Sequence, residues 1–223
     1  MSSPCPLVTI EYVLPDLFKL CPLKPLLNPH YSQVALESSV WINSFGIFAG
    51  CKLDDFMRGG SELLCARTYP DADYDKLRIC CDFVNALFAV DDITDEQDEG
   101  GARTTGTVFL DAMRDSRWDS GTSIGRLCRD LADRFAKGAT PGCYRRLTQL
   151  CAEYIEAVAY EAGVRSRGVA LEIDTYMRMR RDASAVPFCF GLSEFIHGSD
   201  LPDEVYEDPI FRQMYIAATD LVC

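Results

Sequence analysis

Apolar residues recur along most of this chain at the three- and four-residue spacing of an α-helix, and strand-like alternation is almost absent. Such spacing places the apolar side chains on one face of a helix, where neighbouring helices can bury them. A proline-rich arm runs to about Pro29. The pattern after it predicts an all-α bundle, with its clearest helical stretches at residues 31–50, 74–92, 145–163, 172–186 and 209–223.

Two of these stretches carry continuous stripes that predict buried helix faces. The first stripe consists of Leu77, Cys80, Cys81, Val84, Leu87, Phe88 and Asp91. The second consists of Leu147, Leu150, Cys151, Tyr154, Ala157, Val158 and Glu161, and its helix is expected to stop at Gly163. Glycine pairs at residues 59–60 and 100–101 and the segment 137–142 predict turns between helices. Because no long linker interrupts the pattern, we expect one α domain over residues 1–223.

The composition and charge of the chain exclude some classes of function. With 48% hydrophobic and 25% charged residues among 223, the chain can bury one sizeable core. Its 34 acidic and 22 basic residues give a net charge of −12, which repels phosphate backbones, so we expect no nucleic-acid partner. No segment resembles a signal peptide or a membrane span, which predicts a cytoplasmic protein. In that compartment the eleven cysteines, none in a C-x-x-C spacing, are expected to be small buried hydrophobes.

The stretch AVDDITDEQDEGG, residues 89–101, places six carboxylates directly after an apolar run. In a helix Asp91 and Asp95 share one face, and the same face carries Leu87 and Val84 one and two turns earlier. Asp91 therefore continues the buried stripe toward the negative end of the helix dipole, where only a cation relieves the repulsion between the acids. Clustered oxygen ligands without nitrogen or sulfur suit magnesium.

The alternative to a magnesium site is a solvated acidic helix end. That interpretation fits the later acids Glu96, Asp98 and Glu99, whereas it fits Asp91 poorly. No lysine or arginine lies between Asp91 and Arg103, so a neutralising charge must come from elsewhere in the fold or from solution. Spacing and helix phase alone leave both interpretations open.

A second motif, GTSIG at residues 121–125, matches the G-x-S-x-G turn of serine hydrolases. That turn requires a buried strand before the serine, whereas the polar segment DSRWDS precedes it here. The segment therefore predicts the start of a helix that a serine or threonine caps.

Four segments resemble, in the correct order, the class I terpene synthase family, and most closely its fungal sesquiterpene cyclases. The acidic stretch is similar to the D-D/E-x-x-D motif of that family, and the other three segments are similar to its amino-terminal region, its arginine-pair segment and the approach to its second metal motif. The segments are FAVDDITDEQDE, LPDLFKLCPLKPLLNPHYSQVALESSVWI, YMRMRRDASAVPF and LPDEVYEDPIFRQMYIAATDLVC.

The resemblance implies a helical-bundle lyase that ionises farnesyl diphosphate, or a related prenyl diphosphate, and cyclises the allylic cation. It implies that Asp91 is the principal magnesium ligand and that Asp92 and Asp95 are its motif partners, in a family whose complete members hold three magnesium ions with the diphosphate. Arg180 matches the diphosphate sensor, and Arg181 is the second of the arginine pair.

Helix phase agrees with an inward Arg180. Ile173, Tyr176, Met177, Arg180 and Ser184 form one helical stripe, so Arg181 is expected to be more peripheral. An inward guanidinium without an acid on its own stripe suits phosphate oxygens, and the alternative is an ion pair with an acid on another helix. Ser184 and Phe88 are candidates for the cavity wall, although Phe88 also fits an ordinary core position.

Two departures from the family pattern affect the expected activity. Family members often carry threonine, serine and glycine where this chain has Ala183, Ser184 and Ala185, which changes the expected helix break. The second metal motif should follow the chain's last residue, Cys223, so we expect a bundle that is incomplete at its C-terminus, is impaired in catalysis and releases no cyclic terpene.

The alternatives are a non-catalytic terpene-synthase-like protein, a helical interaction module and a chain-elongating prenyltransferase, which would normally show two aspartate-rich motifs. A homodimer is among the assemblies that the sequence permits.

Overall fold

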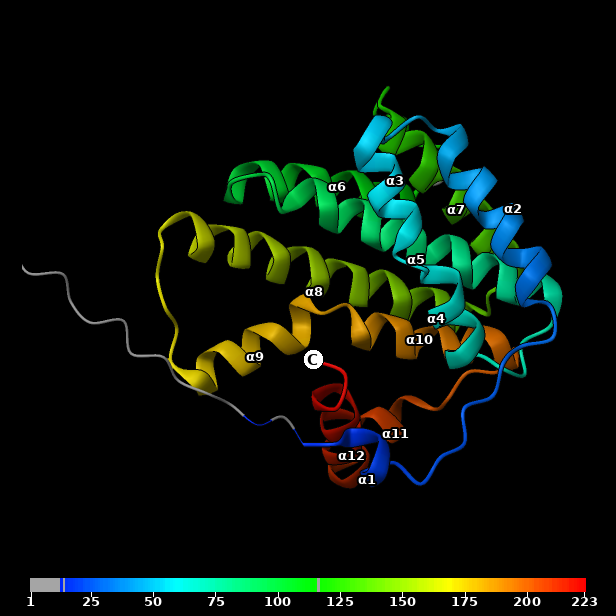
Figure 1. Ribbon diagram of the computed structural model, residues 1–223, viewed down its shortest axis with the longest axis vertical. Coiled ribbons are helices and arrows are strands. Elements are labelled where there is room, and N and C mark those ends of the chain that lie inside the picture. The colour runs from blue at the N-terminus through cyan, green and yellow to red at the C-terminus, as the bar shows by residue number, and fades with distance from the viewer. Residues whose placement is uncertain (1–12, 14, 116) are drawn as a thin grey trace, which may run out of the picture.

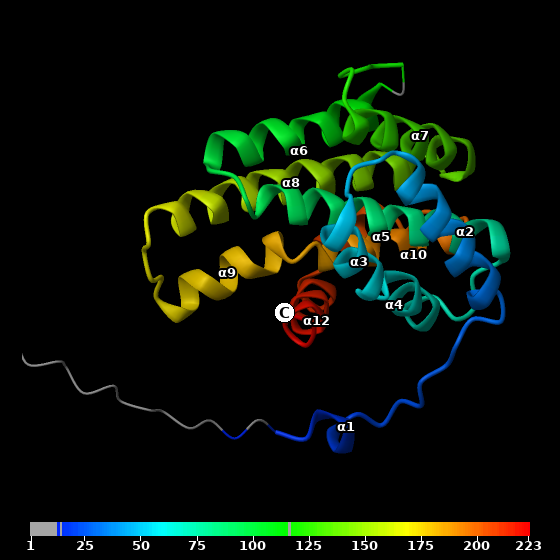
Figure 2. The same cartoon turned by 45° about the horizontal axis from the view of Figure 1, so that its top comes forward.

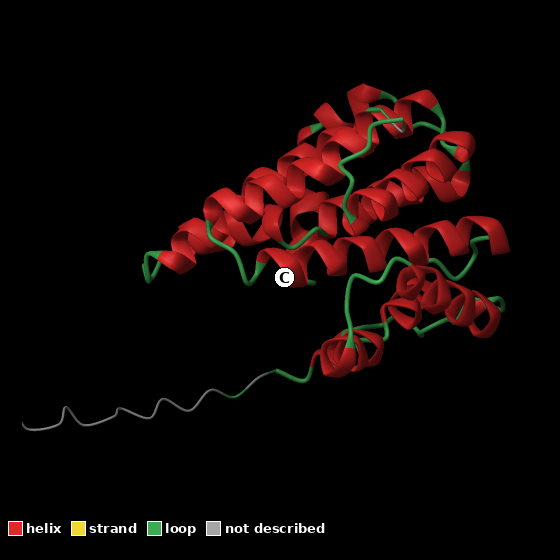
Figure 3. Ribbon diagram, turned by 90° about the horizontal axis from the view of Figure 1, so that it is seen from above, coloured by secondary structure: helices red, strands yellow, loops and turns green. Residues whose placement is uncertain are grey.

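The computed structural model describes residues 13, 15–115 and 117–223, and in these residues it contains helices and no strand (Figures 1 and 3). The all-α prediction is therefore confirmed. No helix among these residues combines the length and the apolar character that crossing a bilayer requires. The helices are α1 (Leu17–Leu20), α2 (Tyr31–Ser44), α3 (Gly50–Arg58), α4 (Ser61–Thr68), α5 (Tyr74–Thr94), α6 (Glu99–Arg114), α7 (Ser123–Gly138), α8 (Pro141–Ser166), α9 (Ile173–Ala183), α10 (Val186–His197), α11 (Asp203–Glu207) and α12 (Pro209–Asp220).

Helix α5 is the central element of the bundle. It begins where the Asp73 side chain accepts a hydrogen bond from the backbone N–H of Lys76, as an N-cap residue should. It then packs against α2, α4, α6, α7, α8 and α10 (Figures 1 and 2). The expected stripe is buried except for Phe88 and the half-buried Asp91, and so are residues on the other faces, Phe83 and Ala86 among them. A helix enclosed on this many sides holds its side chains in fixed directions.

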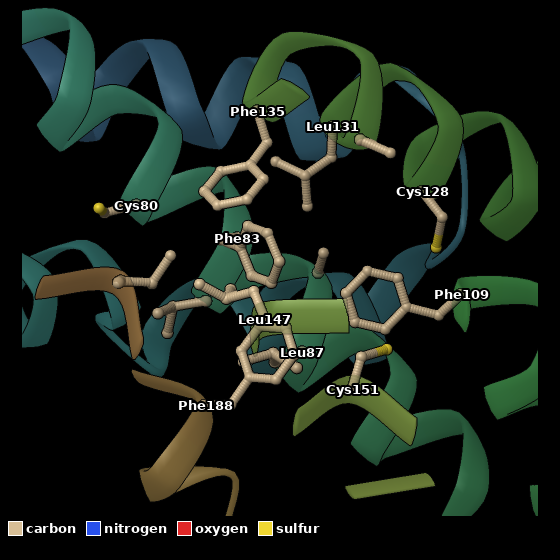
Figure 4. Close-up of a cluster of buried hydrophobic side chains, with 14 of the residues drawn as sticks. Cys80, Phe83, Leu87, Phe109, Cys128, Leu131, Phe135, Leu147, Cys151 and Phe188 are labelled. Carbon is tan, nitrogen blue, oxygen red and sulfur yellow. The ribbon is translucent and has the colours of Figure 1, made fainter. Parts of the chain in front are cut away.

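Phenylalanines from four helices form the centre of the core. The Phe83 ring lies 4.8 Å from the ring of Phe188, 5.5 Å from Phe135 and 5.8 Å from Phe109, measured between centroids (Figure 4). Burial of each such side chain stabilises the fold by roughly 2–3 kcal/mol. The packing joins α5, α6, α7 and α10.

Six of the ten described cysteines are buried free thiols, as expected, and Cys5 lies outside the described residues.

A buried charged network also fixes α5. The Asp82 carboxylate accepts hydrogen bonds from Ser38 at 2.6 Å, from Arg78 at 2.7 Å and from Arg134 at 2.7 Å. Burial raises the pKa of Asp82 to about 6 even though both arginines oppose the rise. The network links α2, α5 and α7. Charged residues rarely lie this deep without partners. The apolar pattern of the sequence gives no sign of this network.

Helix α8 differs in length from the expectation. It continues through Gly163 to Ser166, so the predicted stop at Gly163 is wrong. A Cβ atom at Gly163 would meet the tip of the flexible Glu99 side chain of α6, which would have to move aside. At the other end of α8, the carboxylate of the distant Asp200 accepts hydrogen bonds from the backbone of Gly142 at 3.0 Å and of Cys143 at 2.8 Å.

The segment GTSIG begins α7, as its local sequence predicts. Thr122 is the N-cap residue, and its side chain accepts a hydrogen bond of 3.1 Å from the backbone N–H of Gly125.

Candidate active site

A cavity of about 310 Å³ opens between α4, α5, α8 and the junction of α9 with α10. Its wall is mostly apolar, and Asp91 and Arg180 are the charged residues that line it. The lining residues are Leu64, Cys65, Thr68, Tyr69, Val84, Leu87, Phe88, Asp91, Tyr154, Arg180, Ala183, Ser184, Ala185, Val186, Cys189, Phe190 and Val222. An apolar cavity with one carboxylate and one guanidinium suits a ligand that has a long apolar part and an anionic end.

Asp91 reaches the cavity because the buried stripe of α5 continues to the wall near the end of that helix. Burial raises the pKa of Asp91 to about 6, and the negative charges of Asp95, Glu161 and Asp92 contribute to the rise, whereas Arg180 opposes it. The Tyr154 hydroxyl donates a long hydrogen bond of 3.4 Å to the same carboxylate. Among the described residues no lysine or arginine lies within ion-pair distance of Asp91. The expected uncompensated, inward carboxylate is therefore present.

The other two aspartates of the motif also have neighbours of their own. Asp92 lines a separate cavity of about 280 Å³ with Lys52, and burial raises the pKa of Asp92 while Lys52 opposes that rise. Asp95 follows the end of α5 and forms an exposed ion pair of 3.0 Å with Arg165 of α8. Over residues 13, 15–115 and 117–223, no three side chains of the metal-binding types come together as a complete metal site.

Arg180 and Arg181 differ in their surroundings. Arg180 lines the cavity and has no ion pair in the described part of the chain. Arg181 forms a two-point ion pair with Asp220 of α12, with distances of 2.6 Å from Nε and 2.8 Å from Nη2 to the two carboxylate oxygens. The predicted inward and peripheral directions are therefore seen. The rest of the stripe is less enclosed than expected, since Ile173 is 78% exposed, Tyr176 is 45% exposed and the later residues are only partly buried.

The break between α9 and α10 occurs at Ala185. This residue has a φ angle of +57°, in the left-handed region that favours glycine. Ser184 supports the break, because its hydroxyl donates to the Arg181 carbonyl at 2.9 Å and accepts from the Val186 N–H at 3.3 Å. The helix break is thus formed, and the change expected from the sequence departures is that alanine takes the left-handed position, a conformation that costs free energy.

We expect Ala185→Gly to stabilise the fold by about 1 kcal/mol, because glycine adopts the left-handed conformation without the steric cost of a Cβ atom. Urea unfolding of the two proteins measures the difference. Gly60 already has a positive φ of +70°, so Gly60→Ala serves as the reverse control and should destabilise the chain. A lower unfolding midpoint for Ala185→Gly would contradict the strain at this position.

Phe88 is 41% exposed and lines both the 310 Å³ cavity and the neighbouring cavity of Asp92, so it is a wall residue and not an ordinary core phenylalanine. Glu161 faces the same acids from α8, where burial raises its pKa and Arg180 opposes the rise. Glu161 ends the apolar stripe of α8 as Asp91 ends that of α5, and this shared phase was a signal in the sequence for a site between the two helices.

The raised pKa of Asp91 predicts a pH-dependent cost to stability. Because the pKa is about 6 in the folded chain and 3.8 in the reference state, the folded chain binds more protons between these values, and its stability falls as pH rises through that window. Replacing Asp91 with asparagine removes this cost. We expect Asp91→Asn to raise the free energy of unfolding by about 1 kcal/mol near pH 7.5 and by less near pH 4. Equal gains at both pH values in urea unfolding would refute the assignment.

The comparisons with known proteins agree with this geometry. The sequence profile of terpene synthase family 2, C-terminal metal binding, matches residues 82–223. The chain is 46% identical over 213 residues to a Coprinopsis cinerea protein named linoleate 10R-lipoxygenase COP4, and 44% identical over 213 residues to bifunctional terpene synthase Agr4 of Cyclocybe aegerita. Each alignment covers 96% of this chain and 62% of the relative. The name of the first relative denotes another chemistry and is a statement about that protein alone.

Other fungal relatives that match 95% or more of this chain are named sesquiterpene synthases. Among solved structures, hedycaryol synthase in complex with nerolidol has a TM-score of 0.78 at 21% identity, over 93% of this chain and 69% of that protein. This likeness concerns the fold. The chain spans less than two thirds of the length of its first relatives, and the profile match covers more than half of the chain. The chain belongs to the terpene synthase family.

Proposed function

We propose that this chain is the part of a sesquiterpene synthase that binds farnesyl diphosphate with magnesium and ionises it. One observation supports this most strongly: Asp91 and Arg180, both without ion-pair partners in the described residues, line the same apolar cavity. The farnesyl chain is apolar and the diphosphate is anionic, so the ligand matches both parts of the site. The names of the fungal relatives support the fifteen-carbon substrate class.

Magnesium fits the donor set around Asp91. The charged groups that most affect this carboxylate are other carboxylates, which are hard oxygen ligands, and burial together with their repulsion raises its pKa. Asp91 would hold the metal, with Asp92 and Asp95 as its proposed motif partners. When bound, magnesium would neutralise charge on the diphosphate and make it a better leaving group.

The residues of the chain would supply the remaining chemistry. The Arg180 guanidinium would donate hydrogen bonds to diphosphate oxygens and retain the diphosphate after its bond to the allylic carbon breaks. The apolar wall would exclude water from the allylic cation. Phe88, Tyr154 and Phe190 line the cavity, and their aromatic faces can stabilise a cation. Ser184 would serve mainly to hold the break that follows Arg180.

Equilibrium dialysis with radiolabelled farnesyl diphosphate tests this function on the chain itself. We expect retention in magnesium, loss of retention in chelator, and displacement by unlabelled inorganic diphosphate but not by farnesol. Displacement by farnesol alone would indicate an apolar binding site without diphosphate recognition, and it would overturn the proposal. Gas chromatography of the organic extract from the same mixtures then separates a binding protein from one that completes cyclisation.

A further inference from the structure

Helix α12 is attached to both sides of the break between α9 and α10, beside which it lies in Figures 1 and 2. On the α9 side, the Asp220 carboxylate uses both oxygens to bind the Nε and Nη2 atoms of Arg181. This pairing lowers the pKa of Asp220, so the carboxylate is charged at neutral pH. A two-point pair of this kind fixes the direction of the planar guanidinium more firmly than a single contact.

On the α10 side, a tyrosine of α12 makes the corresponding attachment. The Tyr215 hydroxyl donates a hydrogen bond of 2.9 Å to the carbonyl of Pro187 in the first turn of α10. The Tyr215 ring packs edge-on against Phe190, which lines the cavity, at a centroid distance of 5.4 Å. The strained residue Ala185 therefore lies between two segments that α12 holds in place.

The geometry of α9 transmits this attachment to the cavity. Adjacent residues on a helix point about 100° apart, so a fixed direction for Arg181 also sets the rotation of the last turn of α9 and the direction of Arg180. Arg180 itself forms no ion pair in the described residues, and Asp91 and Glu161 attract it only from beyond ion-pair distance. Its direction therefore depends strongly on the backbone that carries it.

We propose that Asp220 is a positioning residue that directs Arg180 into the cavity by holding Arg181 away from it, with Tyr215 securing the other side of the break. This inference rests on the proposed function, since it gives Arg180 a diphosphate to meet. Asp220 does not line the cavity. Its effect on ligand binding must pass through Arg181 and the end of α9.

A double-mutant cycle tests the role. We expect Asp220→Asn, which keeps the shape and removes the charge, to weaken magnesium-dependent binding of inorganic diphosphate by about fivefold. In an Arg180→Lys background the same substitution should change affinity by less than about twofold, because the positioned group is already altered. Asp203→Asn is the matched control and should leave affinity unchanged. Asp203 forms ion pairs of 2.7 Å with Arg145 and with Arg146, and these pairs are not part of the break.

The outcomes separate this inference from the proposed function. If the native chain does not bind magnesium and diphosphate, the proposed function fails. If the native chain binds but Asp220→Asn weakens binding equally in both backgrounds, or has no effect in the native background, the positioning role is wrong. Tyr215→Phe, which keeps the ring and loses the hydroxyl, provides a second variant with the same expected coupling to Arg180→Lys. Circular dichroism of each variant confirms that the helices are retained before affinity is compared.

Discussion

Asp91→Asn is expected to weaken magnesium-dependent diphosphate binding by about a hundredfold, the largest loss that we expect from one substitution. The side chain keeps its size and its place in the cavity wall and loses the negative charge that a hard cation requires. The carboxylate is uncompensated in this structure, and burial together with the surrounding acids raises its pKa to about 6. Isothermal titration calorimetry with magnesium and inorganic diphosphate measures the change.

Glu99→Gln is the matched control for this prediction. Glu99 belongs to the same acidic stretch, but it is nearly half exposed and pairs with Arg103 and Arg167 at 3.8 and 3.6 Å. We expect it to change affinity by less than about twofold, as surface ion pairs contribute little. Comparable losses in the two variants would mean that the acidic stretch acts only through its overall charge, and the special role of Asp91 would be wrong.

Arg180→Lys is expected to reduce diphosphate affinity by about tenfold, because lysine keeps the charge but loses the planar, two-point donor geometry. Arg181→Lys should reduce affinity by less than about twofold. The substituted lysine would keep a positive charge next to Asp220, so the attachment of α9 to α12 would be weakened and not lost. The same calorimetric titration compares both variants. Greater sensitivity at Arg181 would show that the second arginine, and not the first, meets the diphosphate.

The sequence predicts the inward face of α5 well, because apolar residues at helical spacing tend to be buried together. The stripe that ends at Asp91 lies in the interior, whereas the stripe of α9 is exposed or only partly buried and reaches the cavity at Arg180 and Ser184. The structure brings Asp91, Arg180, Phe88 and Ser184 to one cavity. Their roles in catalysis remain predictions.

The sequence pattern could not predict features that depend on contacts between distant segments. The pairing of Arg181 with Asp220 joins residues 39 positions apart, and the capping of α8 by Asp200 joins residues about 57 apart. Helical spacing carries no information about such partners. For the same reason the basic neighbours of Asp92 and Asp95 could not be foreseen, because Lys52 and Arg165 lie on other helices.

Glycine proved ambiguous for a related reason. Gly163 lies inside α8, whereas Gly168 adopts a φ of +61° just after that helix. The two positions look alike in the sequence, because only the surrounding structure decides which glycine follows a helix end.

A crystal structure of this chain with manganese, as an anomalous substitute for magnesium, and an unreactive farnesyl thiolodiphosphate tests the central claim most directly. The account predicts an anomalous peak at the Asp91 carboxylate, diphosphate oxygens within hydrogen-bond distance of Arg180, and the farnesyl chain along the apolar wall between α4, α5 and α10. Diphosphate density that avoids both Asp91 and Arg180, with the cavity between these helices empty, would contradict it.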